Sequence, residues 1–316
     1  MVGPSHPLTD QAVVEAIVEA TPWIIAVLLI PLTHLGSVLI IVPALAVGYL
    51  WRPRVVAPWI GAIAAYYGLM AGIKSLNSAT RPVIDTPVSA GTYPELFSWW
   101  YTHATSISTT SFPSGNAMVA TLLAGLITLD LNVGTRKQRA LVTGTLAALV
   151  AYSRVGIGVH YPVDVVGGVV LGVVLLGVIV MIRRRTADDI AAIFALGAVC
   201  AAFAIWVTTP VAELPSVDSI AGSNRQVAFG GAVGCLLGWH LKDRYAESFS
   251  DKTAALVTGI CLLVSIAVYS GLGMPTNPVV TTGRTLVFCA AFILLPWVMP
   301  GRATVTRQVR QPQQAD

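Results

Sequence analysis

The chain has 316 residues, of which 55% are hydrophobic and only 11% are charged, and its mean hydropathy is +0.75. A soluble domain carries about a quarter charged residues, so this composition excludes a protein whose whole surface faces water. Apolar runs of about 20 residues recur, and each can cross a hydrocarbon core about 30 Å thick. We therefore predict an all-α fold, a polytopic bundle of transmembrane helices. The net charge of +4 does not indicate a nucleic-acid partner, because the positions of the charges are better explained by topology.

The N-terminal segment, residues 1–34, is predicted to stand apart from the helical core. Within it, Asp10–Leu32 is acidic at first and then apolar, and Pro22 and Pro31 interrupt it. It could form an interfacial helix, a re-entrant helix or half of a hairpin with the first span, and we favour the re-entrant interpretation. No Lys or Arg occurs before Pro22, so the basic region that opens a signal peptide is missing.

About nine spans are predicted after this segment. A core over residues 35–186 and further helices over residues 187–301 contain them, and a polar tail over residues 302–316 is expected on the cytoplasmic side. The apolar runs that define the spans are Leu35–Trp51, Pro58–Leu76, Gly115–Leu131, Leu141–Val159, Val163–Ile182, Ile190–Thr208, Val227–Leu241, Ala254–Leu272 and Thr285–Met299. The four cysteines lie inside such runs without metal-ligand spacing, so neither a metal site, a cofactor nor a disulfide is expected.

Orientation follows from the distribution of basic residues, because cytoplasmic loops are enriched in Lys and Arg. One set of loops holds 14 of the 19 basic residues: Arg52, Arg54, Arg136, Lys137, Arg139, Arg183, Arg184, Arg185, Lys242, Arg244, Lys252, Arg302, Arg307 and Arg310. The opposite face keeps only Lys74, Arg81, Arg154, Arg225 and Arg284. Three of these five fall inside recognisable motifs, so we predict an active site on the non-cytoplasmic face of the cell membrane.

Glycines four residues apart indicate where helices approach each other closely. Such spacings occur at Gly168 and Gly172, and again at Gly230, Gly234 and Gly238. Small residues at this spacing let two helices pack tightly within lipid, and we interpret both rows as structural packing.

The first motif is the run from Lys74 to Pro82 at the end of the second span. Lys74 and Arg81 are seven residues apart, which is two turns of a helix that Pro82 would end, so both cations would point to one face. By itself, the pair is equally well explained by basic side chains that reach from the apolar region to a membrane boundary.

The second motif, from Phe112 to Asn116, opens the third span. Ser114 is a good N-cap, and Gly115 lets an anion approach the backbone. The free amides of a first helical turn, with the helix dipole behind them, form a phosphate site. Many helices begin in this way, so the motif alone is weak.

The third motif runs from Ser153 to Asp164. Arg154 lies within an apolar run, where a charge is costly and indicates a functional role. The four-residue spacing of His160 and Asp164 lets the carboxylate fix the imidazole tautomer, which leaves the other ring nitrogen as a nucleophile. The alternative, an interfacial histidine and a charge at a helix start, leaves Arg154 unexplained.

Together, in this order and spacing, the three motifs resemble the type 2 phosphatidic acid phosphatases over about residues 35–185. The signatures of that family are K-x6-R-P, P-S-G-H and S-R-x5-H-x3-D, and its site is shared with vanadium haloperoxidases and glucose-6-phosphatases. The resemblance implies metal-independent hydrolysis of a membrane lipid phosphate through a phosphohistidine. The residues implied are His160 as nucleophile and Asp164 as its orienting partner, with the phosphate bound by Lys74, Arg81, Arg154, Ser114 and the Gly115 amide.

One position departs from the family pattern. The second motif of the family ends in a histidine that protonates the leaving oxygen, and here Asn116 stands in its place. Asn116 can donate a hydrogen bond to the phosphate, but it cannot give up a proton, and loss of acid catalysis costs about 10²–10⁴-fold in rate. The leaving group could need no acid, as in a prenyl diphosphate. Another acid, His103 or Asp85, could substitute, or the protein could be catalytically weak. We interpret the remaining histidines as incidental: His6, His34 and His240.

Three functions are therefore open. The first is a phosphatase for a lipid monophosphate or, preferentially, a prenyl or other lipid diphosphate. The second is a phosphotransferase that uses the same site. The third is a membrane protein that binds phospholipid without catalysis, for which Asn116 is the main argument and the His160–Asp164 pair the main objection.

Overall fold

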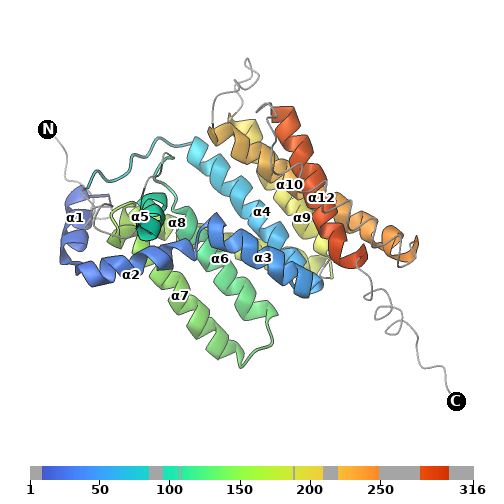
Figure 1. Cartoon of the computed structure of the whole chain (residues 1–316), viewed down its shortest axis with the longest axis horizontal. Coiled ribbons are helices and arrows are strands. Elements are labelled where there is room, and N and C mark those ends of the chain that lie inside the picture. The colour runs from blue at the N-terminus through green and yellow to red at the C-terminus, as the bar shows by residue number, and fades with distance from the viewer. Residues whose placement is uncertain are drawn as a thin grey trace. The chain divides into compact units, whose positions relative to one another are not determined.

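The computed structural model describes residues 9–84, 95–105, 107, 109–187, 189–208, 220–248 and 278–298. All regular secondary structure within these ranges is helical, which confirms the predicted all-α class for this part of the chain (Figure 1). The helices are α1 (Gln11–Ala20), α2 (Trp23–His34), α3 (Val38–Trp51), α4 (Pro53–Ser75), α5 (Glu95–Thr105), α6 (Gly115–Asp130), α7 (Arg136–Gly156), α8 (Pro162–Arg185), α9 (Ile190–Thr208), α10 (Ile220–Ser248) and α12 (Pro278–Val298).

Four of these helices are long and apolar enough to cross a membrane, namely α4, α8, α9 and α12. The pair α1 and α2, bent by 112°, could make a fifth span or a re-entrant loop, and α3 and α6 are apolar but shorter. The membrane character predicted from composition therefore holds in the described residues, whereas the predicted number of nine spans is not confirmed. The predicted span Ala254–Leu272 and the tail 302–316 lie outside the described residues.

The chain divides into two compact units. The first comprises Met1–Ala46 and Gly72–Met181, and the second comprises Val47–Ala71 and Ile182–Asp316. All three motifs belong to the first unit. The division into segments that the sequence suggests, at residues 34, 186 and 301, stays a prediction.

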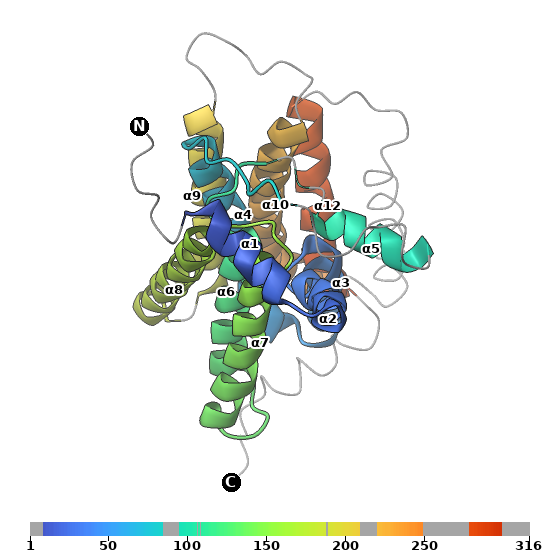
Figure 2. The ribbon, with the colours of Figure 1, turned by 90° about the vertical axis from the view of Figure 1, so that its left-hand side faces the viewer.

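Helices α6 and α7 form an antiparallel hairpin in the first unit (Figures 1 and 2). Gly134 has a φ of +63°, which favours glycine, and Thr135 caps α7 by accepting a hydrogen bond of 3.2 Å from the Gln138 amide. The Gln138 side chain in turn accepts from the Thr135 amide at 2.9 Å, which completes a capping box. These contacts fix where α7 starts, and the helix then delivers Arg154 in its last turn.

Helix α8 packs closely against α6, which confirms the packing role predicted for its glycine row. A Cβ atom at Gly168 would lie 2.4 Å from the Ser114 carbonyl oxygen, and one at Gly172 would lie 2.6 Å from that of Met118. The two helices therefore start side by side, and the Ser114 amide donates to the Asp164 carbonyl oxygen at 2.9 Å. In the other unit, the second glycine row lets α10 pack closely against α12. This row comprises Gly230, Gly234 and Gly238.

The bent pair α1 and α2 packs on the connection between α7 and α8. Val14 and Val18 of α1 form a buried cluster with Val155. In the same way, Leu29 and Ile30 of α2 cluster with Ile157, Val159, Tyr101 and Ala104. These apolar contacts hold the chain segment that carries His160.

Candidate active site

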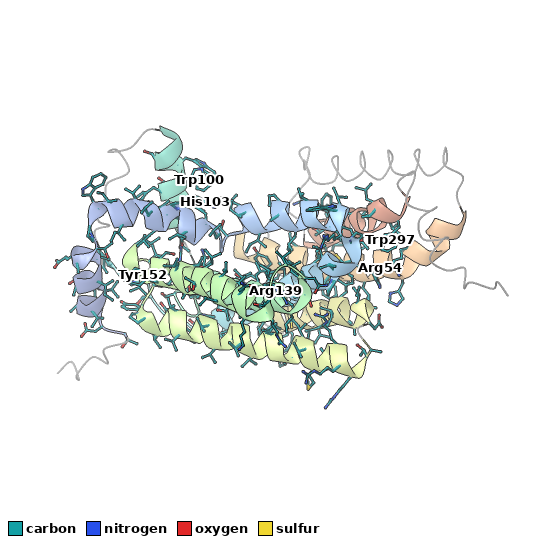
Figure 3. All side chains as sticks on the ribbon, turned by 90° about the horizontal axis from the view of Figure 1, so that it is seen from below. Arg54, Trp100, His103, Arg139, Tyr152 and Trp297 are labelled. Atoms are coloured by element: carbon teal, nitrogen blue, oxygen red, sulfur yellow. The ribbon has the colours of Figure 1, made fainter. Side chains whose placement is uncertain are left out.

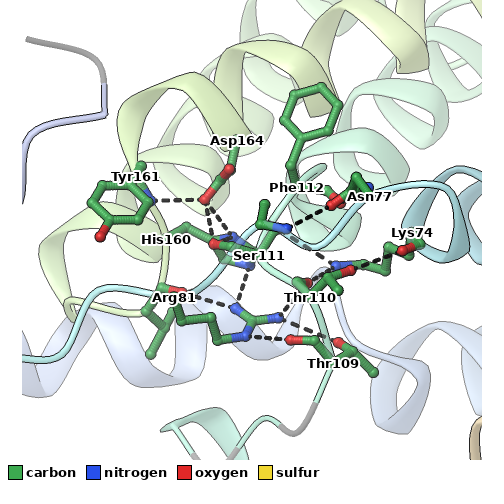
Figure 4. A network of polar contacts seen from close by, with 12 residues as sticks. Lys74, Asn77, Arg81, Thr109, Thr110, Ser111, Phe112, His160, Tyr161 and Asp164 are labelled. Atoms are coloured by element: carbon green, nitrogen blue, oxygen red, sulfur yellow. Dashed lines mark hydrogen bonds and ion pairs between the residues drawn. The ribbon is translucent and has the colours of Figure 1, made fainter. Parts of the chain in front are cut away.

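The first and third motifs meet at the loop that precedes α6 (Figure 4). Lys74 Nζ donates to the Thr110 carbonyl oxygen, and Arg81 Nη2 donates to the same oxygen at 3.2 Å. The prediction that Lys74 and Arg81 share one helical face is wrong, because α4 ends at Ser75 and Arg81 lies beyond it in an irregular segment. The loop, rather than a helix, brings the two cations together.

Arg81 links that loop to the nucleophile candidate. Its Nε donates to the Thr109 carbonyl oxygen at 2.9 Å, and its Nη1 lies 2.8 Å from the Val159 carbonyl oxygen and 3.1 Å from Nε2 of His160. Burial lowers the pKa of Arg81 to about 10, although the Asp164 carboxylate raises it. Arg81 is therefore still a cation at neutral pH.

His160 is held in one tautomer by its two neighbours. A guanidinium can only donate, so Nε2 of His160 must offer its lone pair to Arg81. The proton then sits on Nδ1, which lies 3.2 Å from Oδ2 of Asp164. Burial lowers the pKa of His160 well below its ordinary value, an effect that Asp164 opposes and that Arg154 and Arg81 strengthen. At neutral pH the ring is therefore uncharged, with a lone pair on Nε2.

The carboxylate of Asp164 is itself fixed by other donors. Its Oδ2 accepts hydrogen bonds from Ser111 Oγ and, at 2.9 Å, from the Tyr161 amide, and the Asp164 side chain is buried. Sequence reasoning missed Ser111. Its only sequence signal is a hydroxyl in the Thr-Thr-Ser run before Phe112, and its contact with Asp164 arises from the packing of α8 against α6.

Ser114 occupies the N-cap position of α6, as predicted, but its side chain makes no capping hydrogen bond. Its Oγ is buried and has no hydrogen-bond partner within the described part of the chain. A buried hydroxyl in this condition is uncommon, because an unmade hydrogen bond costs about 1–3 kcal/mol. At a helix N-terminus, beside Gly115, it is suited to donate to an anion.

Arg154 and Asn116 both contact α2. Arg154 Nη1 donates to Thr33 Oγ1 at 2.6 Å, and Asn116 Nδ2 donates to the Thr33 carbonyl oxygen at 2.8 Å. The structure thus adds Thr33 to the site. Nothing in the apolar sequence around it signals this contact, because the contact depends on how α2 folds back onto α6 and α7.

The two other donors considered for the Asn116 position differ in what the structure shows. His103 is exposed and stacks on Trp99, with ring centroids 5.4 Å apart, whereas Asp85 lies outside the described residues. Within the described ranges, no group of three or more His, Cys, Asp or Glu side chains could hold a metal ion. The described side chains of the site form a His–Asp pair with basic residues around it.

Comparisons with known proteins found a family model that matches part of the chain. The sequence profile of the PAP2 superfamily matches residues 55–188, which include all three motifs. Among solved structures, the chain is similar to the first transmembrane PAP2 type phosphatidylglycerolphosphate phosphatase from Bacillus subtilis, with 23% sequence identity and a TM-score of 0.42, over 55% of this chain and 84% of that chain. No curated protein matches the sequence. The match of residues 55–188 supports the resemblance drawn from the motifs at the level of the superfamily.

Proposed function

We propose that the chain is a membrane-embedded lipid phosphatase that works through a phosphohistidine on His160. The observation that carries this proposal is the state of the ring: Nδ1 is turned to Asp164 and Nε2 keeps its lone pair, next to a cation. A pure phosphate-binding site would have no need for a nitrogen lone pair held in this way. The match of residues 55–188 to the PAP2 superfamily supports the same conclusion.

In the proposed reaction, Lys74, Arg81 and Arg154 neutralise the phosphoryl oxygens, while Ser114 and the first turn of α6 donate hydrogen bonds to them. Nε2 of His160 attacks phosphorus, so the Nε2–P bond forms as the bond to the leaving oxygen breaks. Asp164 stabilises the positive charge that develops on the ring. Water then attacks the phosphohistidine and releases phosphate.

The substrate class follows from the setting. A site among apolar helices selects a lipid phosphate or diphosphate, and the distribution of basic residues favours the non-cytoplasmic face. Asn116 cannot protonate a leaving oxygen. Unless another side chain does so, the site favours diphosphates, whose departing phosphate is far less basic than an alkoxide.

The test is whether His160 becomes phosphorylated without a metal. Full-length protein in detergent, treated with EDTA, should release phosphate from a lipid monophosphate or a prenyl diphosphate and form an acid-labile phosphoenzyme. The His160→Ala variant should lose both activities, by about 10⁴-fold or more in turnover. Lys137→Ala, in the first turn of α7, is the matched control and should keep both. Turnover in the His160 variant, or loss of wild-type activity in EDTA, contradicts the proposal.

A further inference from the structure

The reaction proposed above lacks one component, a proton for the leaving oxygen of a phosphomonoester. An alkoxide is a poor leaving group, so general acid catalysis is worth about 10²–10⁴-fold. The side chains at the site have other partners or no proton to give: Asn116 carries no transferable proton, Ser111 donates to Asp164, Arg81 is a guanidinium, and Lys74 donates to the carbonyl oxygens of Thr110 and Ser111. An additional ionisable group near the first turn of α6 is needed.

The turn between α2 and α3 lies directly against that position. A Cβ atom at Gly36 would lie 3.0 Å from both Cβ and the carbonyl oxygen of Asn116. Thr33, three residues earlier, receives hydrogen bonds from Asn116 and from Arg154. His34, the last residue of α2, follows Thr33 directly and lies between these two contact points in the chain, and it is only 2% exposed.

The His34 ring is oriented by one hydrogen bond. Its Nε2 lies 2.9 Å from the carbonyl oxygen of Trp100, where α5 meets α2, and the rings of His34 and Trp100 are in edge contact with centroids 4.8 Å apart. Figure 3 shows Trp100 and His103 next to each other on α5. A carbonyl oxygen only accepts, so Nε2 carries a proton. Nδ1 is buried and has no hydrogen-bond partner among the residues that the structure describes. Nδ1 is therefore the ring atom that can take up and release a second proton.

Burial lowers the pKa of both His34 and His160, and the positive charge of Arg154 lowers each of them further. The two imidazoles are held differently, since His160 faces a carboxylate and His34 faces a neutral carbonyl. A carboxylate stabilises the imidazolium that forms during attack, whereas a neutral carbonyl favours release of the proton. Two ionisable groups in contrasting environments are the usual mark of distinct catalytic roles.

We propose that His34 is the leaving-group acid of this site, in place of the group that Asn116 cannot supply; this rests on the function proposed above. As the P–O bond breaks, Nδ1 of His34 gives its proton to the departing ester oxygen, which leaves as an alcohol. In the second step the same nitrogen takes a proton from the water that attacks the phosphohistidine, so His34 returns to its starting form. The interpretation of His34 as incidental is thereby replaced. Lipid monophosphates become substrates.

The experiment compares two probes that differ in their need for a proton. The leaving alkoxide of dodecyl phosphate needs one, and the phenolate of 4-nitrophenyl phosphate does not. His34→Gln keeps a donor for the Trp100 carbonyl but has no acid. We expect it to lower kcat/KM for dodecyl phosphate by about 10²–10³-fold, and that for 4-nitrophenyl phosphate by less than about tenfold. Wild-type activity on dodecyl phosphate should fall as pH rises through the pKa of His34, which burial holds below its ordinary value, and this fall should be absent in His34→Gln.

Two further variants separate chemistry from folding. His103→Gln removes the exposed neighbour that stacks on His34 with ring centroids 5.9 Å apart, and it should leave the ratio of the two activities unchanged. Asn116→His, added to His34→Gln, places an imidazole on the first turn of α6 and should restore dodecyl phosphate hydrolysis selectively.

The assignment of His34 is overturned by any of three results. His34→Gln could lower the hydrolysis of both probes equally without this rescue, or it could leave the ratio of the two activities unchanged. His103→Gln could lower dodecyl phosphate hydrolysis selectively. If the wild-type protein hydrolyses neither probe and no lipid diphosphate, the proposed function itself fails.

Discussion

At the scale of single residues, the buried pair of His160 and Asp164 makes stability depend on pH. Burial lowers the pKa of His160, so below about pH 6.5 the unfolded chain binds a proton that the folded protein does not bind. Stability is therefore lost as pH falls below that value, by about 1.4 kcal/mol for each pH unit from this one group.

Thermal unfolding at pH 7 and pH 5 measures the effect. On acidification, His160→Gln should become more stable relative to the wild type, by about 2 kcal/mol at pH 5. His240→Gln changes an exposed histidine and supplies the control, which should follow the wild type at both pH values. Parallel behaviour of His160→Gln and the wild type would show that the ring is not held uncharged.

The sequence predicts contacts between neighbouring residues of the chain better than it predicts contacts between distant ones. His160 and Asp164 are four residues apart, across the start of α8, so their spacing alone predicts their contact. By contrast, Ser111 reaches Asp164 and Thr33 reaches Arg154 across 53 and 121 residues. Such contacts depend on tertiary packing, which a residue pattern does not contain.

At the scale of helices, the close approach of α8 to α6 sets the position of Ser114 next to Asp164. Gly168→Ala would place a Cβ 2.4 Å from the Ser114 carbonyl oxygen. We expect this overpacking to lower the free energy of unfolding by about 1–3 kcal/mol and to reduce hydrolysis of 4-nitrophenyl phosphate. Gly177 is on the same helix with nothing within 4 Å of its Cβ position, so Gly177→Ala should leave activity unchanged. Equal effects of the two substitutions would exclude the contact as a determinant of the site.

A helix boundary is well predicted where a local capping residue sets it and poorly where a contact with a distant loop sets it. The start of α6 at Gly115 agrees with the N-cap expected at Ser114. The end of α4 at Ser75 does not agree with a helix that runs to Pro82. Asn77 explains the difference: its side chain donates to the carbonyl oxygens of Ile73 and Phe112, at 2.8 and 3.1 Å, and thus satisfies the helix end by a contact with a distant loop.

At the scale of the whole molecule, the distribution of basic residues predicts which side of the membrane the site faces. Val83 is 82% exposed just beyond Arg81, and Val133 is 70% exposed on the turn between α6 and α7. In intact cells, a membrane-impermeant thiol reagent should label Val83→Cys, whereas Val133→Cys should react only after permeabilisation. The unsubstituted protein gives the background from its own cysteines. Reversal of the two results would place the site on the cytoplasmic side.

In the reaction that we propose, the contact between Arg81 and His160 also keeps the ring from reacting with molecules other than the substrate. While Nη1 of Arg81 donates to Nε2 of His160, the lone pair of that nitrogen is engaged. An uncharged electrophile has no anionic oxygen that could replace Nε2 as the acceptor for the guanidinium. A phosphate group can replace Nε2, because its anionic oxygens bind a guanidinium more strongly than a neutral nitrogen can. In the proposed reaction, the lone pair of His160 is therefore engaged until an anionic substrate binds Arg81. Selectivity against uncharged electrophiles then arises before any of them is recognised by shape.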